Sequence, residues 1–212
     1  MKNNMKNNNN ILPLNLHDIL IGLMLGDGHI YKSSPTSNSR FEINFGKDRN
    51  LFAAWVADLF KDYSNSGLKT FYYNRSLFDT SFRYGFKTKS LPIFNYYHDL
   101  FYQKDKLTWK YKKIVPSNIE SLMNSTVLAY LIMTDGNFDK SRNRIRIYTN
   151  SYSKMEVERL ANSIQLKLCI YVGVLHDRKD QWILTIGAKQ LENLRYLVKA
   201  HFEPSMLYRI GC

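Results

Sequence analysis

The sequence predicts an α+β protein made of two similar halves, each with the element order αββαββα. An apolar stretch that ends in Asp-Gly occurs twice, at residues 20–28 and 128–136, and its two aspartates lie 108 positions apart in a chain of 212 residues. Similar strand-like and helical runs follow each copy. A repeat with a period of about half the chain indicates an internal duplication. We therefore expect a pseudo-two-fold arrangement of two four-stranded antiparallel sheets, with the repeated helices packed at the centre.

Each copy of the repeated stretch has the composition of a buried helix and ends in an aspartate followed by glycine. Glycine tolerates a positive φ and commonly follows the last helical residue. A carboxylate in the last turn is disfavoured by about 0.3–1 kcal/mol, because the helix C-terminus carries partial negative charge. An ordinary Asp-Gly turn explains one such aspartate. Two of them at matched positions, Asp27 and Asp135, indicate a use for clustered negative charge, and a divalent cation is the simplest occupant.

Small residues on the first of these helices predict that the two helices pack closely. Gly22 and Gly26 are four positions apart and share a helix face, and the matching residues of the second copy are Tyr130 and Thr134. Small residues opposite larger ones allow close approach. The pairing would bring the two aspartates side by side at one end.

The first half is expected to contain three helices and four strands. Its first helix begins after Asp18 as the N-cap and runs to Asp27. The other elements are strands at 29–32, 40–45, 69–73 and 80–87 and helices at 51–63 and 91–102. Alternation in two of these strands directs one set of side chains to the helices (Phe41, Ile43, Phe45, Phe82, Tyr84, Phe86) and another outward (Arg40, Glu42, Asn44, Arg83, Lys87). The helix at 51–63 is expected to bury Leu51, Trp55, Leu59 and Phe60.

The second half repeats this order after the helix that ends at Asp135. We expect strands at 144–150, 170–175 and 182–186, a charged hairpin at 176–181, helices at 154–167 and 189–202, and a closing segment at 205–210. The strand at 144–150 places Arg144, Arg146, Tyr148 and Asn150 on one face. The helix at 154–167 presents Val157, Leu160, Ala161 and Ile164 for burial.

Composition divides the chain into four segments. Residues 1–15 form a polar, Asn-rich tail that is expected to be disordered. Residues 16–103 and 125–212 are the two halves, and residues 104–124 are a basic linker between them. The linker is either a solvated connection or a DNA-backbone contact that also delivers a lysine to the site.

The net charge of +12 at pH 7 indicates a polyanionic partner, and nucleic acid is the first choice. A membrane surface is disfavoured because the sequence has no long apolar span and no basic amphipathic helix; a basic surface without a partner is the third possibility. The two cysteines and five scattered histidines argue against a disulfide framework and a zinc site. No secretory signal is present. Enrichment in Asn, Lys, Tyr and Ile is typical of an AT-rich genome and points to mitochondria.

The two repeated stretches resemble the LAGLIDADG motif of homing endonucleases and intron maturases. The residues that match the nine-letter motif are Leu20, Gly22, Leu23, Asp27 and Gly28 in the first copy and Leu128, Ala129, Leu131, Ile132, Asp135 and Gly136 in the second. Leu25 and Met133 replace the acid at its sixth letter, which is not the family's metal ligand. The resemblance covers nearly all of the chain after about residue 15. It implies a saddle of two sheets that binds a long, asymmetric DNA site as a monomer and makes a metal-dependent double-strand break.

The resemblance also implies roles for individual residues. Asp27 and Asp135 would hold two or three Mg²⁺ ions, which Mn²⁺ can replace, and each would serve one DNA strand. Gly26 and Thr134 are the neighbouring metal ligands that it implies. The other implied catalytic residues are Lys113 and Arg209, at comparable places in the two halves, with Asn44 and either Asn150 or Tyr148 near the metal-bound water. The side chains expected to contact DNA are Arg40, Glu42, Asn44, Arg83, Lys87, Lys112, Arg144, Arg146 and Tyr148.

Three other functions are compatible with parts of the pattern. An intron RNA maturase would have the same fold and charge, with intron RNA as its partner, but it has less need for paired helix-end acids. A DNA-binding regulator on this scaffold usually carries an additional DNA-binding domain, for which we expect no residues here. A two-carboxylate glycosidase would not require the strong positive charge.

Overall fold

The computed structural model describes residues 11–76, 79–105 and 108–212. The helices are α1 (Leu14–Leu25), α2 (Asn50–Leu59), α3 (Asn95–Phe101), α4 (Ile119–Leu122), α5 (Ser125–Asp135), α6 (Lys154–Leu168) and α7 (Leu191–Val198). The strands are β1 (His29–Tyr31), β2 (Arg40–Gly46), β3 (Leu68–Ser76), β4 (Asp79–Lys87), β5 (Tyr102–Lys104), β6 (Tyr111–Lys113), β7 (Gly136–Asp139), β8 (Arg144–Ile147), β9 (Gly173–Arg178) and β10 (Gln181–Ile186). Short 3-10 segments connect several of them, and the longest is Pro204–Ile210.

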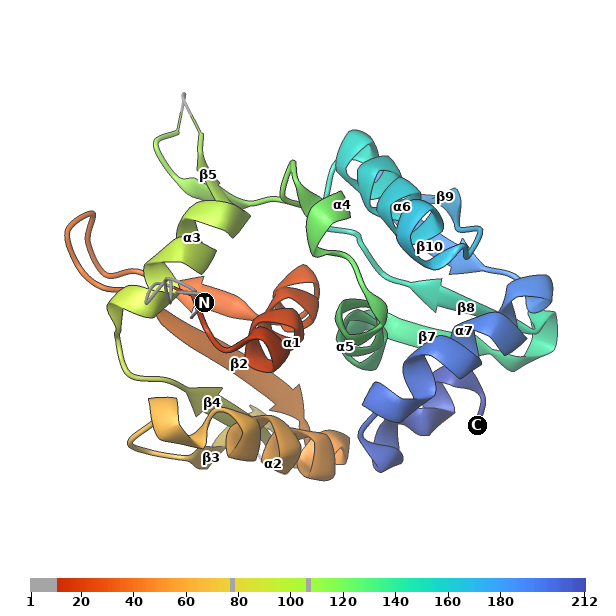
Figure 1. The fold of residues 1–212 in the computed structure, drawn as a ribbon. Coiled ribbons are helices and arrows are strands. Elements are labelled where there is room, and N and C mark those ends of the chain that lie inside the picture. The colour runs from red at the N-terminus through yellow and green to blue at the C-terminus, as the bar shows by residue number, and fades with distance from the viewer. Residues whose placement is uncertain (1–10, 77–78, 106–107) are drawn as a thin grey trace, which may run out of the picture.

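The two halves have the same sheet topology. The antiparallel sheet of the first half has the order β1-β2-β4-β3, and that of the second has the order β7-β8-β10-β9. The halves lie on either side of α1 and α5, which are adjacent at the centre of the molecule (Figure 1). The predicted α+β fold with two four-stranded antiparallel sheets is confirmed.

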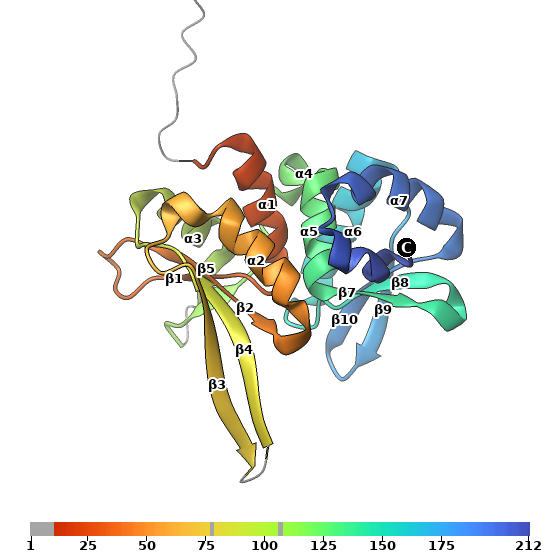
Figure 2. The ribbon, with the colours of Figure 1, turned by 90° about the horizontal axis from the view of Figure 1, so that it is seen from below.

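Helices cover one face of each sheet and leave the other face open (Figure 2). Phe41, Ile43 and Phe45 of β2 are buried as expected, because alternate strand residues point to the helix side. The four α6 residues expected in the core are also buried. We call the uncovered face of each sheet its open face. The hairpin of β3 and β4 extends beyond the helices (Figure 2).

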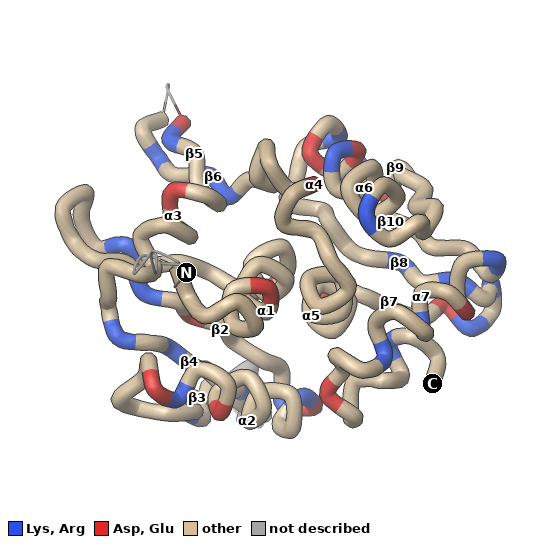
Figure 3. Tube along the Cα trace, in the orientation of Figure 1, with Lys and Arg blue, Asp and Glu red and all other residues tan. Residues whose placement is uncertain are grey.

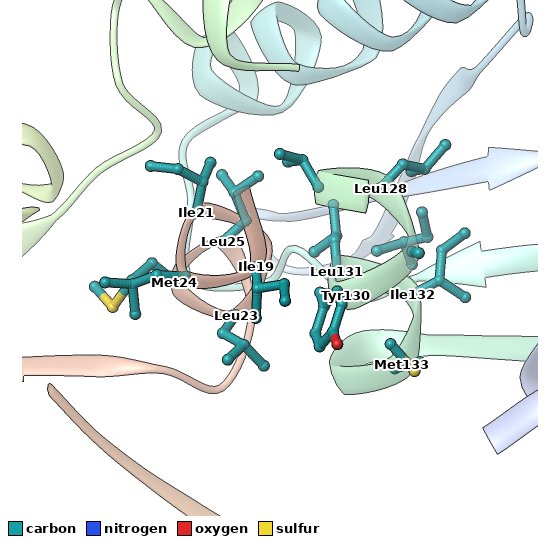
Figure 4. Close-up of a cluster of buried hydrophobic side chains, with 14 of the residues drawn as sticks. Ile19, Ile21, Leu23, Met24, Leu25, Leu128, Tyr130, Leu131, Ile132 and Met133 are labelled. Carbon is teal, nitrogen blue, oxygen red and sulfur yellow. The ribbon is translucent and has the colours of Figure 1, made fainter. Parts of the chain in front are cut away.

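The central helices α1 and α5 are buried on nearly all sides, as Figure 4 shows for their apolar side chains. Leu20, Ile21 and Leu23 of α1 and Leu131 and Ile132 of α5 are all fully buried. Each such side chain contributes about 1.5–3 kcal/mol to folding. Apolar composition around the whole helix therefore reflects a pair enclosed by both halves.

Two expectations for the first half are wrong. Helix α1 begins at Leu14 after Pro13, so Asp18 lies inside the helix and does not cap it. Residues 14 and 15 of the predicted tail are therefore helical, and its first ten residues lie outside the described part. Helix α2 buries Phe52, Ala53 and Val56, whereas Leu51 and Trp55 are more than two-fifths exposed. The helix is one residue out of phase with the expected buried face, although Phe60 is buried as expected.

The strands of the second half also differ from the expectation. Strand β7 was missed, because its sequence Gly-Asn-Phe-Asp has no alternation. Strand β8 ends at Ile147, so Tyr148 and Asn150 follow the strand. The predicted hairpin at 176–181 is largely strand, since β9 and β10 extend into it and pair there.

The connection between the halves is more ordered than a solvated linker. Strands β5 and β6 form an antiparallel hairpin in which Tyr102 pairs with Lys113. The chain after β6 is anchored to α6, because Val115 N donates to Glu156 Oε1 at 3.1 Å and Arg159 Nη1 donates to Val115 O at 3.0 Å. These contacts fix Lys113 between the two halves.

Among the described residues, no helix is long and apolar enough to span a membrane.

Candidate active site

Close packing of α1 on α5 brings the two motif aspartates to one end of the pair. A Cβ atom on Gly22 would lie 2.6 Å from Val127 O and 2.7 Å from Tyr130 Cβ, so only glycine fits there. A Cβ atom on Gly26 would lie 2.5 Å from Asp135 Oδ2 and overlap the Thr134 side chain. The expected contact of small with larger residues is confirmed.

The glycines that follow the aspartates are also required because they lack a side chain. Neither Gly28 nor Gly136 has a positive φ, which corrects the expected reason for the motif glycine. A Cβ atom on Gly28 would lie 2.7 Å from Leu23 O, and one on Gly136 would lie 2.6 Å from Ile132 O. The chain turns back against the end of its own helix at both places, and this places each aspartate at the helix end.

The two aspartates have different surroundings. Burial, and next the neighbouring charge of Asp27, raise the pKa of Asp135 from 3.8 to about 7. Asp27 is more exposed and forms an ion pair with Arg49, whose Nη1 lies 3.1 Å from Asp27 Oδ2. The two carboxylates repel each other, so a bound cation would favour the charged form of Asp135.

Lys113 lies near the end of α1 and donates to carbonyl groups of the residues that follow this helix. Its Nζ atom is 2.7 Å from both Gly26 O and Gly28 O. Burial lowers its pKa to about 8, although Asp135 and Asp27 act in the opposite direction. The ammonium group is thus held beside both aspartates and titrates closer to neutrality than an exposed lysine.

Arg209 occupies the corresponding position in the second half. It comes from the 3-10 segment Pro204–Ile210, and its Nη1 donates to Gly136 O. Its charge also acts to lower the pKa of Asp135, after the contributions of Lys113 and Arg49. The structure therefore places one cation beside the carbonyl of the glycine after each motif aspartate.

Asn44 and Tyr148 are equivalent by strand register. Gly136 pairs with Ile147, and the register of β1 with β2 sets Gly28 opposite Ile43 in the same way. The next residue is Asn44 in one half and Tyr148 in the other. Asn150 lies two residues beyond this position and lines a hollow together with both aspartates.

Two hollows flank the aspartates. The first, of about 490 Å³, is lined by Asp27, Asn44, Arg49 and Arg209, among others. The second, of about 420 Å³, is lined among others by Asp27, Asp135, Tyr148 and Asn150. Five of the expected catalytic residues, Asp27, Asp135, Asn44, Asn150 and Arg209, thus line hollows that share Asp27, whereas Lys113 lines neither of them.

The oxygen donors fit a hard divalent cation that keeps several waters. Asp27 and Asp135 supply carboxylates, and Asn150 Oδ1 is buried without a hydrogen-bond partner. The Thr134 hydroxyl is less suited, because it donates to Tyr130 O at 3.1 Å and to Leu131 O at 2.9 Å. The metal ligand expected at Thr134 would therefore be its main-chain carbonyl. Within the described ranges, no three His, Cys, Asp or Glu side chains form a metal-binding group, so waters would complete the coordination.

The residues expected to contact DNA lie mainly on the open faces, and Lys and Arg occur along the strands of both sheets (Figure 3). Arg40 pairs with Glu42 at 2.5 Å, and Arg146 pairs with Asp177 at 3.0 Å. Arg144 pairs with Asp139 at 3.1 Å. Arg83 and Lys87 are exposed on β4. Lys112 lies on neither open face, because it belongs to β6 in the separate two-stranded sheet, and its contact with DNA stays a prediction.

Arg49 is the residue that the sequence analysis missed. It ends the 3-10 segment Lys47–Arg49, directly after β2, and reaches Asp27 across 22 positions of sequence. The signal available was a charged Lys-Asp-Arg run immediately after a predicted strand. Charged runs in loops are common, so this signal alone did not distinguish Arg49.

The family model and the curated relatives that match this chain agree with each other. The model of the LAGLIDADG DNA endonuclease family matches residues 17–194. The chain is 31% identical over 133 residues to the intron-encoded endonuclease ai4 of Dictyostelium discoideum, a match that covers 61% of this chain and 77% of that protein. It is 27% identical over its full length to the cytochrome b mRNA maturase bI2 of Saccharomyces cerevisiae, of which the match spans 51%.

Solved structures show the same fold. The homing endonuclease I-WcaI bound to its DNA recognition sequence has a TM-score of 0.84 at 21% identity, covering 94% of this chain and 87% of that chain. I-DmoI in complex with DNA and Mn has a TM-score of 0.57 at 16% identity, covering 90% of this chain and 99% of that chain.

Proposed function

The chain belongs to the LAGLIDADG DNA endonuclease family, and from this premise we propose that it is a site-specific homing endonuclease. It would make a double-strand break in a long, asymmetric DNA target by hydrolysing one phosphodiester bond in each strand. The observation that carries the proposal is the pair of aspartates, Asp27 and Asp135, held at one end of the central helices and surrounded by Lys113, Arg49 and Arg209.

The open faces of the sheets support DNA binding. A two-stranded ribbon fits the major groove of B-DNA, and its side chains read base edges there. The two open faces differ in sequence, so the two half-sites would differ as well. Since both halves lie in one chain, a monomer would bind the whole target.

Asp27 and Asp135 would hold the metal, with a contribution from Asn150 and main-chain carbonyls. A divalent cation, Mg²⁺ in the cell or Mn²⁺ in its place, neutralises phosphate charge and activates water when bound. The presence of Mn in the DNA complex of I-DmoI supports a divalent cation. Asn44 and Tyr148 would orient water at the two scissile phosphates from equivalent strand positions.

The cations of the site would stabilise charge on the phosphates. Arg209 and Arg49 stay protonated at all relevant pH values, so they act electrostatically. Lys113 has a lowered pKa of about 8, so it can donate or accept a proton as well as supply charge. Lys113 and Arg209 would each serve the strand nearer to their own half.

The proposal is tested with a randomised duplex library in Mg²⁺ and, separately, in EDTA or Ca²⁺. Double-strand breaks at one long site in Mg²⁺ and none in EDTA are the expected result. Absence of any cleavage, with any metal, at a site that is bound tightly would contradict an endonuclease.

A second candidate is an intron RNA maturase. The full-length match to the cytochrome b mRNA maturase bI2 favours it. Tight DNA binding without cleavage would lead to a splicing assay on the intron transcript. Both candidate functions are typical of intron-encoded proteins. We propose that this protein is located in mitochondria.

A further inference from the structure

An exposed aromatic ring lies on the open face of the N-terminal sheet. Phe71 of β3 pairs with Arg83 of β4, and the neighbouring Lys69 pairs with Gly85. Phe86 is buried on the helix side, so Arg83 and Gly85, which alternate with it, point to the open face. The side chain of Phe71 is on this face too and is 45% exposed.

Gly85 forms a seat for this ring. A Cβ atom on Gly85 would lie 2.6 Å from Phe71 Cε2 and 3.0 Å from Asn44 Oδ1. The ring therefore lies across the bare backbone of Gly85, next to a residue of the proposed active site. A glycine inside a strand costs stability, and close approach of another group is one reason to find it there.

Three cationic side chains and one carboxylate, that of Glu42, line the hollow beside the ring. The Arg83 guanidinium carbon is 5.9 Å from the ring centre. Phe71 and Gly85 line a hollow of about 290 Å³ together with Lys69, Arg83 and Lys87. The lysines and the arginine would attract a polyanion to this hollow. A group of that polyanion that enters the hollow would contact the apolar ring of Phe71.

The position that corresponds to Phe71 in the second sheet is polar. Strand β9 carries Asp177 there, and its carboxylate accepts from Arg146 Nη2 at 3.0 Å. Asn150 Nδ2 also donates to this network through Gln181 Oε1 at 2.8 Å. At this place the N-terminal sheet thus has an aromatic ring and the second sheet has a carboxylate, although Leu175, two positions earlier on β9, is 38% exposed.

We propose that Phe71 is a specificity-determining residue that contacts the 5-methyl group of a thymine in the half-site bound by the N-terminal half. The inference rests on the proposed function, since it assumes that the open face lies in the major groove. Thymine is the base whose major-groove edge carries a methyl group, and apolar side chains are the groups that recognise it. The lysines and arginine around the ring contact phosphates and polar base edges.

The test uses the duplex that the protein selects from the randomised library. Each thymine of this target is replaced singly by deoxyuridine, which removes only the methyl group, and the Kd of each duplex is measured in Ca²⁺. For the wild-type protein we expect one thymine, in one half-site, whose replacement weakens binding roughly four-fold, the value for one buried methyl group. The Phe71→Ala variant is expected to bind both duplexes of that pair equally.

Tyr72→Ala is the matched control. Tyr72 is the adjacent residue on the same strand and is 73% exposed, but it points to the opposite face. This variant should keep the thymine preference. Gly85→Ala, which displaces the ring without altering it, should lose the preference, and Phe71→Leu should retain part of it.

The outcomes separate this inference from the proposed function. Cleavage of the unmodified target by the wild type tests the endonuclease and is independent of any methyl group. If no thymine replacement distinguishes the wild type from Phe71→Ala while both bind the target, the assignment of Phe71 is wrong. Thermal unfolding of each variant shows that loss of preference does not reflect loss of fold.

Discussion

Lys113 and Arg209 lie at equivalent points of the two halves, because each donates to the main-chain carbonyl of the glycine that follows a motif aspartate. Lys113 does so to Gly28 at 2.7 Å and Arg209 does so to Gly136. Their origins differ, since one ends strand β6 and the other belongs to the last 3-10 segment. The duplication thus supplies each half with one cation, with a lysine on one side and an arginine on the other.

This equivalence predicts strand-selective defects. Lys113→Met should slow cleavage of one strand by on the order of 10²-fold and leave the cleavage rate of the other strand nearly unchanged. Nicked DNA should therefore accumulate. Arg209→Met should slow the opposite strand. End-labelled target duplexes measure the two rates separately. Lys112→Met, at an adjacent exposed lysine, is the control and should not change the ratio of the two rates. The same strand slowed by both variants would disprove the assignment.

The motif aspartates are expected to be required for cleavage and dispensable for binding. Asp27→Asn and Asp135→Asn remove a charged metal ligand, so double-strand cleavage should fall by on the order of 10³-fold. Sequence-specific Kd values should change little. Asp58→Asn, on the surface of α2, is the control for a lost carboxylate. Full cleavage activity in either motif variant would remove the proposed metal site.

Arg49→Gln tests the role of Arg49, which the structure places beside Asp27 and the sequence did not predict. Loss of its ion pair with Asp27 should reduce cleavage about ten-fold or more, because a charge next to the metal ligand is removed. Stability should change by less than about 1 kcal/mol, as for other partly exposed ion pairs. Lys61→Gln breaks a similar pair with Asp58, far from the open faces, and should leave cleavage unchanged. Normal cleavage rates for Arg49→Gln would show that the pair is only structural.

The stability of the metal-free protein should fall as the pH rises from about 4 to 7. Asp135 keeps its proton in the folded state up to a pKa of about 7, whereas the unfolded chain loses it near 3.8. Folding therefore takes up a proton in this range, and stability declines with increasing pH. Denaturant unfolding at pH 5 and pH 7.5 measures the difference. Asp135→Asn should reduce this difference in the free energy of unfolding, and a divalent cation should restore stability at pH 7.5. If the variant keeps the full pH dependence, another group is its cause.

The close contact of the central helices should make Gly22→Ala strongly destabilising. The added methyl would lie within 2.7 Å of both Val127 O and Tyr130 Cβ, so the helices must separate. We expect a loss of about 1–3 kcal/mol in the free energy of unfolding. Gly46→Ala is the control, because a Cβ atom there meets nothing within 4 Å. Equal stability of the two variants would argue against close packing of α1 on α5.

Local patterns carried most of the fold prediction. The alternation in β2 identified its buried face, and the spacing of apolar residues in α6 identified the face that packs on the sheet. Short elements without such a pattern were missed or shifted, as β7 and β9 show. Helix α2 was assigned the wrong face because apolar residues occur on two sides of it, and packing against the sheet selects between them.

The sequence by itself determined the duplication, the buried central helices and the positions of Asp27 and Asp135, because these depend on composition and period within short stretches. Only the tertiary structure decided which other groups join them. Lys113 reaches Gly28 across 85 positions, and Arg209 reaches Gly136 across 73. The raised pKa of Asp135 and the exposed ring of Phe71 over Gly85 likewise arise from packing between distant segments. Distance and burial are properties of that packing, and no local pattern encodes them.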